Sequence, residues 1–210
     1  MNQNAALILV DIQNDFLPGG ALAVPQGDEI IPLVNELQNR FDLIVATQDW
    51  HPKNHGSFAE NHDGKEIGEL ISLNGLQQIL WPVHCVQETD GGMFAENLNR
   101  EKVKKIFPKG TNIEVDSYSG FYDNGHFQST GLSEYLKEKN ITRVFIVGLA
   151  TDYCVKYTAL DALKLGFETI VFSDATRAVN IQPGDFDQAI EAMENAGVKV
   201  LSAKELLLKN

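Results

Sequence analysis

Short apolar runs and helix-like stretches alternate along the chain. Apolar runs of strand length occur at residues 6–11, 42–49, 103–109, 142–149, 167–174 and 198–203. Apolar residues recur at helical spacing over residues 28–41, 132–140, 152–166 and 185–197. Strands that are apolar on both faces are typical of a covered parallel sheet, and their alternation with helices predicts an α/β fold with helices on each side.

The chain shows no internal repeat, low-complexity segment or linker, so residues 1–210 are expected to form one domain. Residues 50–92 contain many Gly, His and Asn residues and are interpreted mostly as loop. Loops of that length in compact domains are usually functional. Gly166 is expected to end the third of the four predicted helices.

Composition narrows the class of protein. Apolar residues make up 43% and charged residues 22%, as in a globular protein, and the formal net charge is −12. Phosphate binding needs a basic face, so nucleic acid and anionic membranes are not expected partners. The N-terminus lacks a signal-peptide pattern, and no run reaches the ~18–20 apolar residues of a membrane span. The chain has two cysteines, which do not make a disulfide framework. We therefore expect a cytoplasmic protein with free thiols.

Reactive side chains follow several of the predicted strands. Asp11 ends the first strand, Asp49 ends the second, and Cys154 comes shortly after the fifth. In parallel sheets, ligands bind beyond the carboxyl ends of the strands. These three residues are therefore expected to gather at one edge of the sheet.

Cys154 has three interpretations: an inert buried filler, a redox or metal ligand, or a nucleophile. If Thr151 or Asp152 caps the helix, the thiol lies in its first turn, where the helix dipole lowers a thiol pKa and backbone N–H groups can hold an oxyanion. Gly148 before the helix favours the functional interpretation. A redox pair with Cys85 has no C-x-x-C spacing to support it.

Asp49 and His51 stand two residues apart, so in an extended segment both can face one metal ion. His84 is a candidate third ligand from a distant segment, and His55 follows closely in sequence. A mixed nitrogen and oxygen set suits Zn²⁺, Fe²⁺ or Mn²⁺ and leaves open positions for water or substrate. The competing interpretation is a solvated loop.

The remaining candidates are individually weak. Asp11 is either a general base or a turn-forming residue. Lys109 is an ordinary solvated lysine unless the fold brings it to the thiol. Cys85 is interpreted as a small buried filler, and His62 and His126 as surface residues.

Five segments together resemble one family closely. They are "LILVDIQNDFLPGGALAV", "TQDWHPKNHGSFA", "WPVHCVQETDGGMF", "FPKGTNIEVDSYSGF" and "VFIVGLATDYCVKYTALDA". The family is the nicotinamidase, or pyrazinamidase, branch of the isochorismatase-like cysteine hydrolases, and the resemblance runs from about residue 6 to 180. It implies a three-layer α/β/α fold with a six-stranded parallel sheet.

The resemblance also implies a role for particular residues. The catalytic triad would be Asp11, Lys109 and Cys154. The metal ligands would be Asp49, His51 and His84, with His55 at a position that ligates metal in only some members. Phe16, Trp81 and Tyr118 would surround the substrate ring. A cis peptide would join Leu149 to Ala150, and the N–H groups of Ala150 and Cys154 would bind the oxyanion.

The implied reaction converts nicotinamide to nicotinate and ammonia through a cysteine thioester, in NAD salvage, with pyrazinamide as a further substrate. The implied cofactor is one divalent metal ion, zinc ahead of iron or manganese. Three alternatives remain open at this point. One is a related cysteine hydrolase acting on another amide, a ureido or carbamoyl compound, or the isochorismate vinyl ether. Another is a hydrolase with a metal-bound hydroxide nucleophile, and the last is an acidic binding or redox protein.

Overall fold

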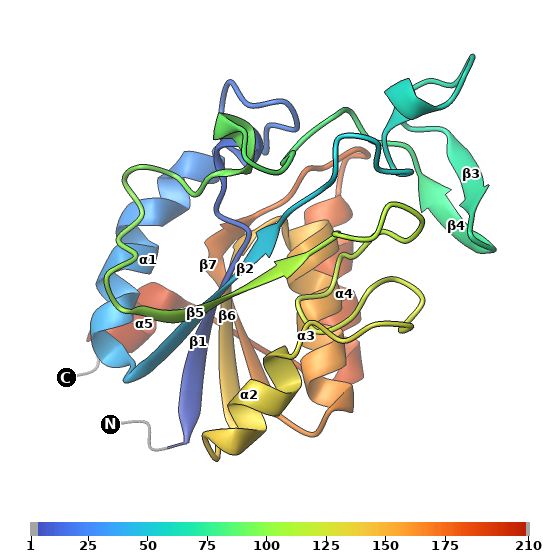
Figure 1. The fold of residues 1–210 in the computed structure, drawn as a ribbon. Helices are drawn as coiled ribbons and strands as arrows, with labels where there is room; N and C mark the ends of the chain where they lie inside the picture. Colours follow the sequence, from blue (N-terminus) through green and yellow to red (C-terminus); the bar gives the residue numbers. More distant parts are fainter. Residues whose placement is uncertain (1–3, 209–210) are drawn as a thin grey trace.

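A six-stranded parallel sheet forms the centre of the computed structural model, which describes residues 4–208 (Figure 1). Each strand pairs in parallel with its neighbours. In spatial order the strands are β5 (Val103–Lys109), β2 (Leu43–Asp49), β1 (Ala5–Val10), β6 (Arg143–Leu149), β7 (Glu168–Arg177) and β8 (Lys199–Leu201). All six lie within or close to the predicted runs.

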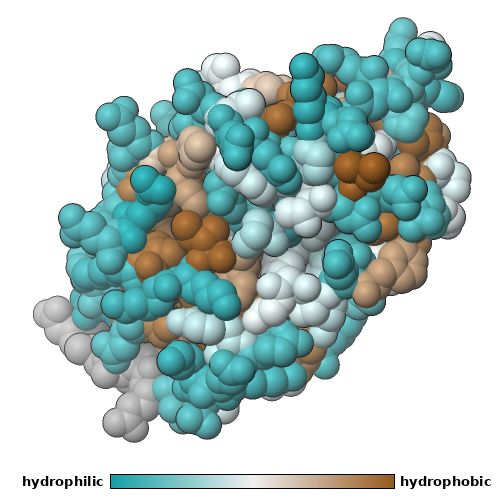
Figure 2. Space-filling model, viewed as in Figure 1, coloured by the Kyte–Doolittle hydropathy of each residue, from teal (hydrophilic) through white to brown (hydrophobic). Residues whose placement is uncertain are grey.

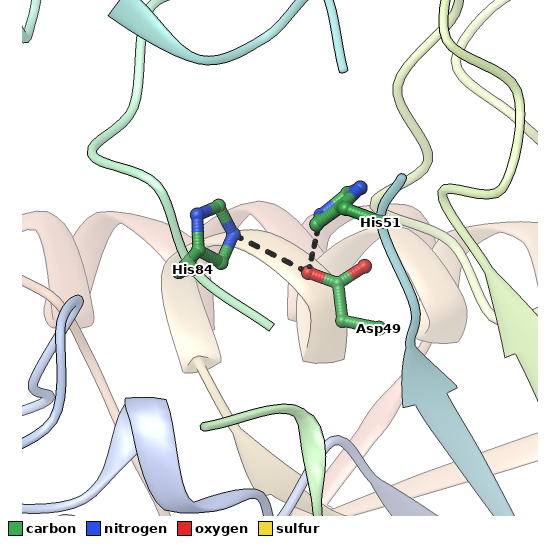
Figure 3. Close-up of side chains that lie close together, drawn as sticks. All are labelled: Asp49, His51 and His84. Carbon is green, nitrogen blue, oxygen red and sulfur yellow. Dashed lines mark hydrogen bonds and ion pairs between the residues drawn. The ribbon is translucent and has the colours of Figure 1, made fainter. Parts of the chain in front are cut away.

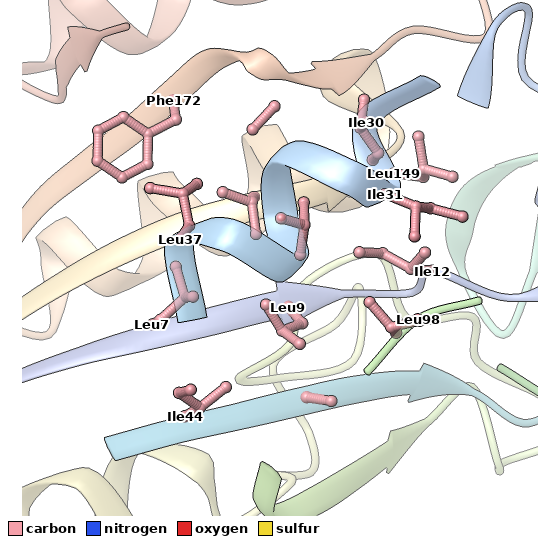
Figure 4. Close-up of a cluster of buried hydrophobic side chains, with 14 of the residues drawn as sticks. Leu7, Leu9, Ile12, Ile30, Ile31, Leu37, Ile44, Leu98, Leu149 and Phe172 are labelled. Carbon is pink, nitrogen blue, oxygen red and sulfur yellow. The ribbon is translucent and has the colours of Figure 1, made fainter. Parts of the chain in front are cut away.

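Helices cover both faces of this sheet. In β1, the side chains of Leu7 and Leu9 enter one core cluster and those of Ile8 and Val10 enter the other. Figure 4 shows the first cluster, in which Leu7 and Leu9 pack near Leu37. Helices α1 (Ile31–Leu37) and α5 (Ala203–Leu208) contribute to the first cluster, and α2 (Leu132–Glu138), α3 (Lys156–Lys164) and α4 (Asp185–Ala196) to the second. The three-layer prediction is confirmed.

Two of the predicted helices are built from more than one type of turn. The stretch 28–41 is a 3₁₀ turn (Gly27–Ile30), then α1, then a second 3₁₀ turn (Gln38–Arg40). The stretch 152–166 begins as a π-helical turn (Thr151–Val155) and continues as α3. Gly166 follows this helix with φ of +90°, as expected of a residue that ends a helix.

A hairpin in the predicted loop 50–92 is an element that the hydrophobic pattern missed. Strands β3 (Leu70–Leu73) and β4 (Leu76–Ile79) pair antiparallel and stand apart from the main sheet (Figure 1). Asn74 and Gly75 join them, with φ values of +49° and +80°. Asn-Gly with two positive φ angles is the favoured two-residue hairpin turn, so the sequence did contain the signal.

The C-terminal end also differs from the prediction. The expected strand 198–203 ends at Leu201, and α5 begins at Ala203. Ser202 Oγ accepts a hydrogen bond from the N–H of Glu205, at 3.4 Å. This Ser-x-x-Glu pattern is a helix-start signature that the apolar periodicity did not reveal.

In the described part of the chain, no helix is both long and apolar enough to cross a membrane. The face shown in Figure 2 is mostly hydrophilic, with smaller separate hydrophobic areas. This surface agrees with the charged composition.

Candidate active site

Three strand ends and one helix start supply the reactive side chains. Asp11 follows β1, Asp49 is the last residue of β2, and Lys109 is the last residue of β5. Cys154 lies in the π-helical turn after β6. All four side chains are at least nine-tenths buried. The fold thus brings together, at the carboxyl edge of the sheet, residues that are far apart in sequence.

Lys109 is the centre of this group. Its Nζ lies 2.9 Å from Asp11 Oδ2, 2.9 Å from Asp49 Oδ1 and 3.4 Å from Cys154 Sγ. It also donates to the carbonyl of Ser117 at 2.8 Å. Burial favours the neutral amine, but the carboxylates of Asp11 and Asp49 outweigh it and raise the pKa of Lys109 well above its ordinary value. Lys109 is therefore an ammonium ion rather than the solvated lysine of the weaker interpretation.

Asp11 has one partner on each carboxylate oxygen. Oδ1 accepts a hydrogen bond from the Thr47 hydroxyl at 2.6 Å, and Oδ2 forms an ion pair with Lys109 Nζ. Burial raises the pKa of Asp11, and the Lys109 charge opposes that rise. A carboxylate with a raised pKa next to a thiol is suited to take a proton and return it.

The expected lowering of the Cys154 pKa is wrong. Burial raises the pKa of this thiol well above its ordinary value, and Lys109 offsets burial only in part. The expected caps are also wrong, because Ala150 precedes the helix and no side chain caps it. The carboxylate of Asp152 instead accepts the N–H groups of Val179 and Asn180. Cys154 is therefore a neutral thiol that needs a neighbouring base.

Asp49, His51 and His84 form a buried group of metal-binding type (Figure 3). The Nε2 atoms of His51 and His84 lie 3.0 and 3.4 Å from Asp49 Oδ2. The other ring nitrogen of each histidine contacts a backbone carbonyl, that of Gly110 at 2.9 Å and that of Pro82 at 2.8 Å. Such contacts leave Nε2 of each ring to face a metal ion, so the donor set fits a divalent cation.

The two oxygens of Asp49 have different partners. Oδ1 faces Lys109, and Oδ2 faces the two histidines. Burial opposes ionisation of Asp49, but the charges of His51 and Lys109 hold its pKa well below the usual range. One carboxylate therefore joins the metal-binding group to the lysine that contacts the thiol.

His55 lies beside the metal-binding group and belongs to a second cluster, with His51 and Asp116. Its ring centroid is 4.4 Å from that of His51, and Nδ1 lies 2.7 Å from Ser57 Oγ. Burial, reinforced by the charge of His51, lowers the pKa of His55 to about 4, so its ring is neutral. Its role as a ligand stays a prediction.

A small pocket opens onto these groups. Its wall includes Cys154 together with Asp49 and His84. The three residues predicted to surround an aromatic ring, Phe16, Trp81 and Tyr118, also line it, as does Ala150. The peptide between Leu149 and Ala150 is cis, as the resemblance implied.

Comparisons with known proteins agree with this arrangement. The family model described as the isochorismatase domain matches residues 5–205. The chain belongs to the isochorismatase family. A nicotinamidase of Escherichia coli is 49% identical over 196 residues, which cover 91% of this chain and 92% of that protein.

Within the isochorismatase family, two solved structures are also similar over nearly the whole chain. One is a nicotinamidase and pyrazinamidase of Acinetobacter baumanii, with a TM-score of 0.94, 47% identity and coverage of 98% of this chain and 99% of that one. The other is a pyrazinamidase of Pyrococcus horikoshii in complex with zinc, with a TM-score of 0.78, 43% identity and coverage of 95% and 99%. The chain is thus a full-length relative of nicotinamidases.

Sequence reasoning missed several residues of the pocket wall: Leu22, Asp116, Tyr153 and Val179. Tyr153 packs edge-on against Trp81, with ring centroids 4.9 Å apart. Asp116 accepts a hydrogen bond from Gln78 at 3.0 Å, and Gln78 also contacts the Tyr118 hydroxyl at 3.2 Å. Gln78 lies on the unpredicted strand β4, so its contacts with these two wall residues are revealed only by the three-dimensional structure.

Two remaining expectations concern residues away from the pocket. Cys85 is fully buried in the first core cluster, in agreement with its interpretation as a filler. His126 is exposed, as expected, whereas His62 is half-buried and contacts the carbonyl of Gly56 at 2.7 Å. None of these residues adds to the chemistry of the site.

Proposed function

We propose that the protein is a nicotinamidase, which hydrolyses nicotinamide to nicotinate and ammonia in NAD salvage and also deamidates pyrazinamide. The observation that carries the proposal is the contact of Lys109 with both Cys154 and Asp11, beside a pocket that Cys154, Asp49 and His84 line. Full-length similarity to nicotinamidases and pyrazinamidases supports the same reaction.

In the first half of the proposed reaction, Asp11 takes the proton of the Cys154 thiol. The sulfur attacks the carboxamide carbon, and the N–H groups of Ala150 and Cys154 bind the oxygen that becomes negative. Asp11 then gives its proton to the nitrogen, the C–N bond breaks, and ammonia leaves a thioester behind. Lys109 stays protonated throughout, which compensates for the negative charge that forms beside it.

In the second half, a water molecule replaces ammonia. Asp11 takes a proton from this water as its oxygen attacks the thioester carbon. The C–S bond breaks, nicotinate leaves, and the proton on Asp11 returns to the sulfur. The raised pKa of Asp11 supports this cycle, because it makes the carboxylate a stronger base toward the Cys154 thiol.

The ring of the substrate would lie among Phe16, Trp81 and Tyr118. Asp49, His51 and His84 would hold one divalent metal ion, zinc ahead of iron or manganese, and His55 stays a candidate further ligand. When bound, the ion would supply a Lewis-acid partner for the ring nitrogen of the substrate. Asp49, His84 and Cys154 all line the pocket, which supports a substrate whose ring is held near the metal-binding group while its carboxamide lies at the sulfur.

The test is ammonia release from nicotinamide by purified protein, before and after chelation and again after reloading with zinc. Intact mass after acid quenching is measured on the same samples. We expect turnover that chelation abolishes and zinc restores, with a transient nicotinoyl adduct on the protein. No turnover by zinc-loaded protein would reject nicotinamide and direct the search to ureido and carbamoyl compounds. Turnover that survives carboxamidomethylation of Cys154 would instead indicate a metal-bound hydroxide nucleophile.

A further inference from the structure

The segment that follows β1, residues 13–15, contacts both parts of the chain that supply the metal-binding group. Gln13 reaches the end of β2, where Asp49 lies, and Asp15 reaches the loop that carries His84. Neither side chain belongs to the predicted site, and neither lines the pocket. Their contacts are with the backbone of the other two segments.

Gln13 binds both backbone polar groups of Asp49. Its Nε2 donates to the Asp49 carbonyl at 2.8 Å, and its Oε1 accepts the Asp49 N–H at 2.8 Å. The same Nε2 donates to the carbonyl of Gly92 at 2.9 Å. The pairing of β2 with β1 ends at Ala46. Beyond that residue, the buried side-chain amide of Gln13 takes the place of β1 as the hydrogen-bonding partner of β2. On the β1 side of β2 the Gln13 side chain therefore holds the Asp49 main chain, and on the other side Asp49 pairs with Lys109 of β5.

Asp15 contacts the segment that carries His84. Its Oδ2 accepts the N–H of Cys85, the residue after His84, at 2.7 Å, and its Oδ1 accepts the N–H of Ala21 at 3.2 Å. A Cβ atom on Gly91 would collide with the Asp15 carboxylate, so the loop passes close over it only because glycine stands there. Asp15 thus anchors the loop that presents His84.

We infer that Gln13 and Asp15 are positioning residues for metal binding: Gln13 sets the place of Asp49, and Asp15 sets the place of His84. Groups that orient metal ligands typically change metal affinity by about 10- to 100-fold when they are removed. Here the oriented groups are backbone amides, and a shift of either segment moves a ligand away from the point where three donors meet. The inference rests on the proposed metal group but not on the proposed substrate.

The experiment measures the zinc dissociation constant of the purified full-length protein by competition with a chelating dye. Gln13→Met removes the contacts with Asp49, and its matched control is Gln48→Met. Gln48 donates to the same Gly92 carbonyl at 2.9 Å but does not hold the Asp49 backbone. We expect zinc to bind at least about tenfold more weakly to Gln13→Met and within about twofold of wild type to Gln48→Met.

Asp15→Asn has its own control in Asp90→Asn. Asp90 lies on the adjoining loop, with an exposed side chain and the same charge, and the contact that it makes with Asn14 uses its backbone carbonyl. We expect Asp15→Asn to weaken zinc binding about tenfold and Asp90→Asn to leave it near wild type. If Gln13→Met does not fold, the comparison of Asp15→Asn with Asp90→Asn still tests the inference.

Unfolding of the metal-free variants separates positioning from general stability. A purely structural role would lower the unfolding midpoint and leave the zinc dissociation constant of the folded protein unchanged. Wild-type affinity in both folded variants, or an equal loss in each control, would overturn the inference. If wild-type protein itself binds no zinc, the metal part of the proposed function fails as well, so the two failures are distinguishable.

Discussion

Replacing Lys109 by Met would test the interpretation that this residue is a buried cation shared by the carboxylates of Asp11 and Asp49. The side chain is 2% exposed and lies 2.9 Å from both Asp11 and Asp49. Methionine keeps most of its length and removes its charge. Two carboxylates would then share a buried site without the cation between them.

The expected loss of stability follows from the burial of that group. Removing one partner of a buried ion pair costs about 3–5 kcal/mol, because the remaining charge stays out of water without compensation. Lys109 lowers the pKa of Asp11, whereas burial and Asp49 raise it, so the substitution raises that pKa further. A carboxyl whose folded-state pKa exceeds its unfolded value loses stability as pH rises between the two values. The difference in unfolding free energy between wild type and Lys109→Met should therefore be larger at about pH 8 than at about pH 5.

The assay is urea unfolding of the metal-free proteins at both pH values, with Lys104→Met as the control. Lys104 is an exposed lysine on the same strand, so its loss should change stability by less than about 0.5 kcal/mol. A loss below about 1 kcal/mol for Lys109→Met at the higher pH would refute the buried-cation interpretation. A loss of unfolding free energy that becomes larger toward acid pH would refute the assignment of the raised pKa to Asp11.

Three further predictions concern the nucleophile and its base. Cys154→Ala should abolish ammonia release while retaining nicotinamide binding by calorimetry, and substantial remaining turnover would exclude a covalent route. Burial raises the pKa of the Cys154 thiol, so carboxamidomethylation of the metal-free protein should be slow near neutral pH and its rate should still increase above about pH 9. Mass spectrometry can follow this rate, and a rate that levels off near pH 7 would contradict the prediction. Thr47→Val removes the 2.6 Å hydrogen bond to Asp11 and should cost about 1–3 kcal/mol in urea unfolding. Thr47→Ser should keep most of that stability, and equal losses in the two variants would assign the effect to packing.

The sequence by itself determined the order and type of most elements. The apolar runs predict β1, β2, β6 and β7 well, because a strand buried on both faces needs apolar residues at nearly every position. The Asn74–Gly75 turn and the Ser202–Glu205 helix start are also local signals, although periodicity alone does not register them. Local chemistry of this kind can be read without knowing what lies nearby in space.

The strand ends predicted that Asp11, Asp49 and Cys154 gather, and the family resemblance implied Lys109 as their partner, but the tertiary structure decided the contacts themselves and the surroundings of each side chain. Gln13 and Asp49 are 36 residues apart, and Lys109 and Cys154 are 45 apart, so no local pattern records their contacts. The same is true of the Cys154 pKa, for which helix position predicts lowering and burial produces the opposite result. Charge and desolvation depend on everything within a few ångströms, and only the folded sheet and its loops define that neighbourhood.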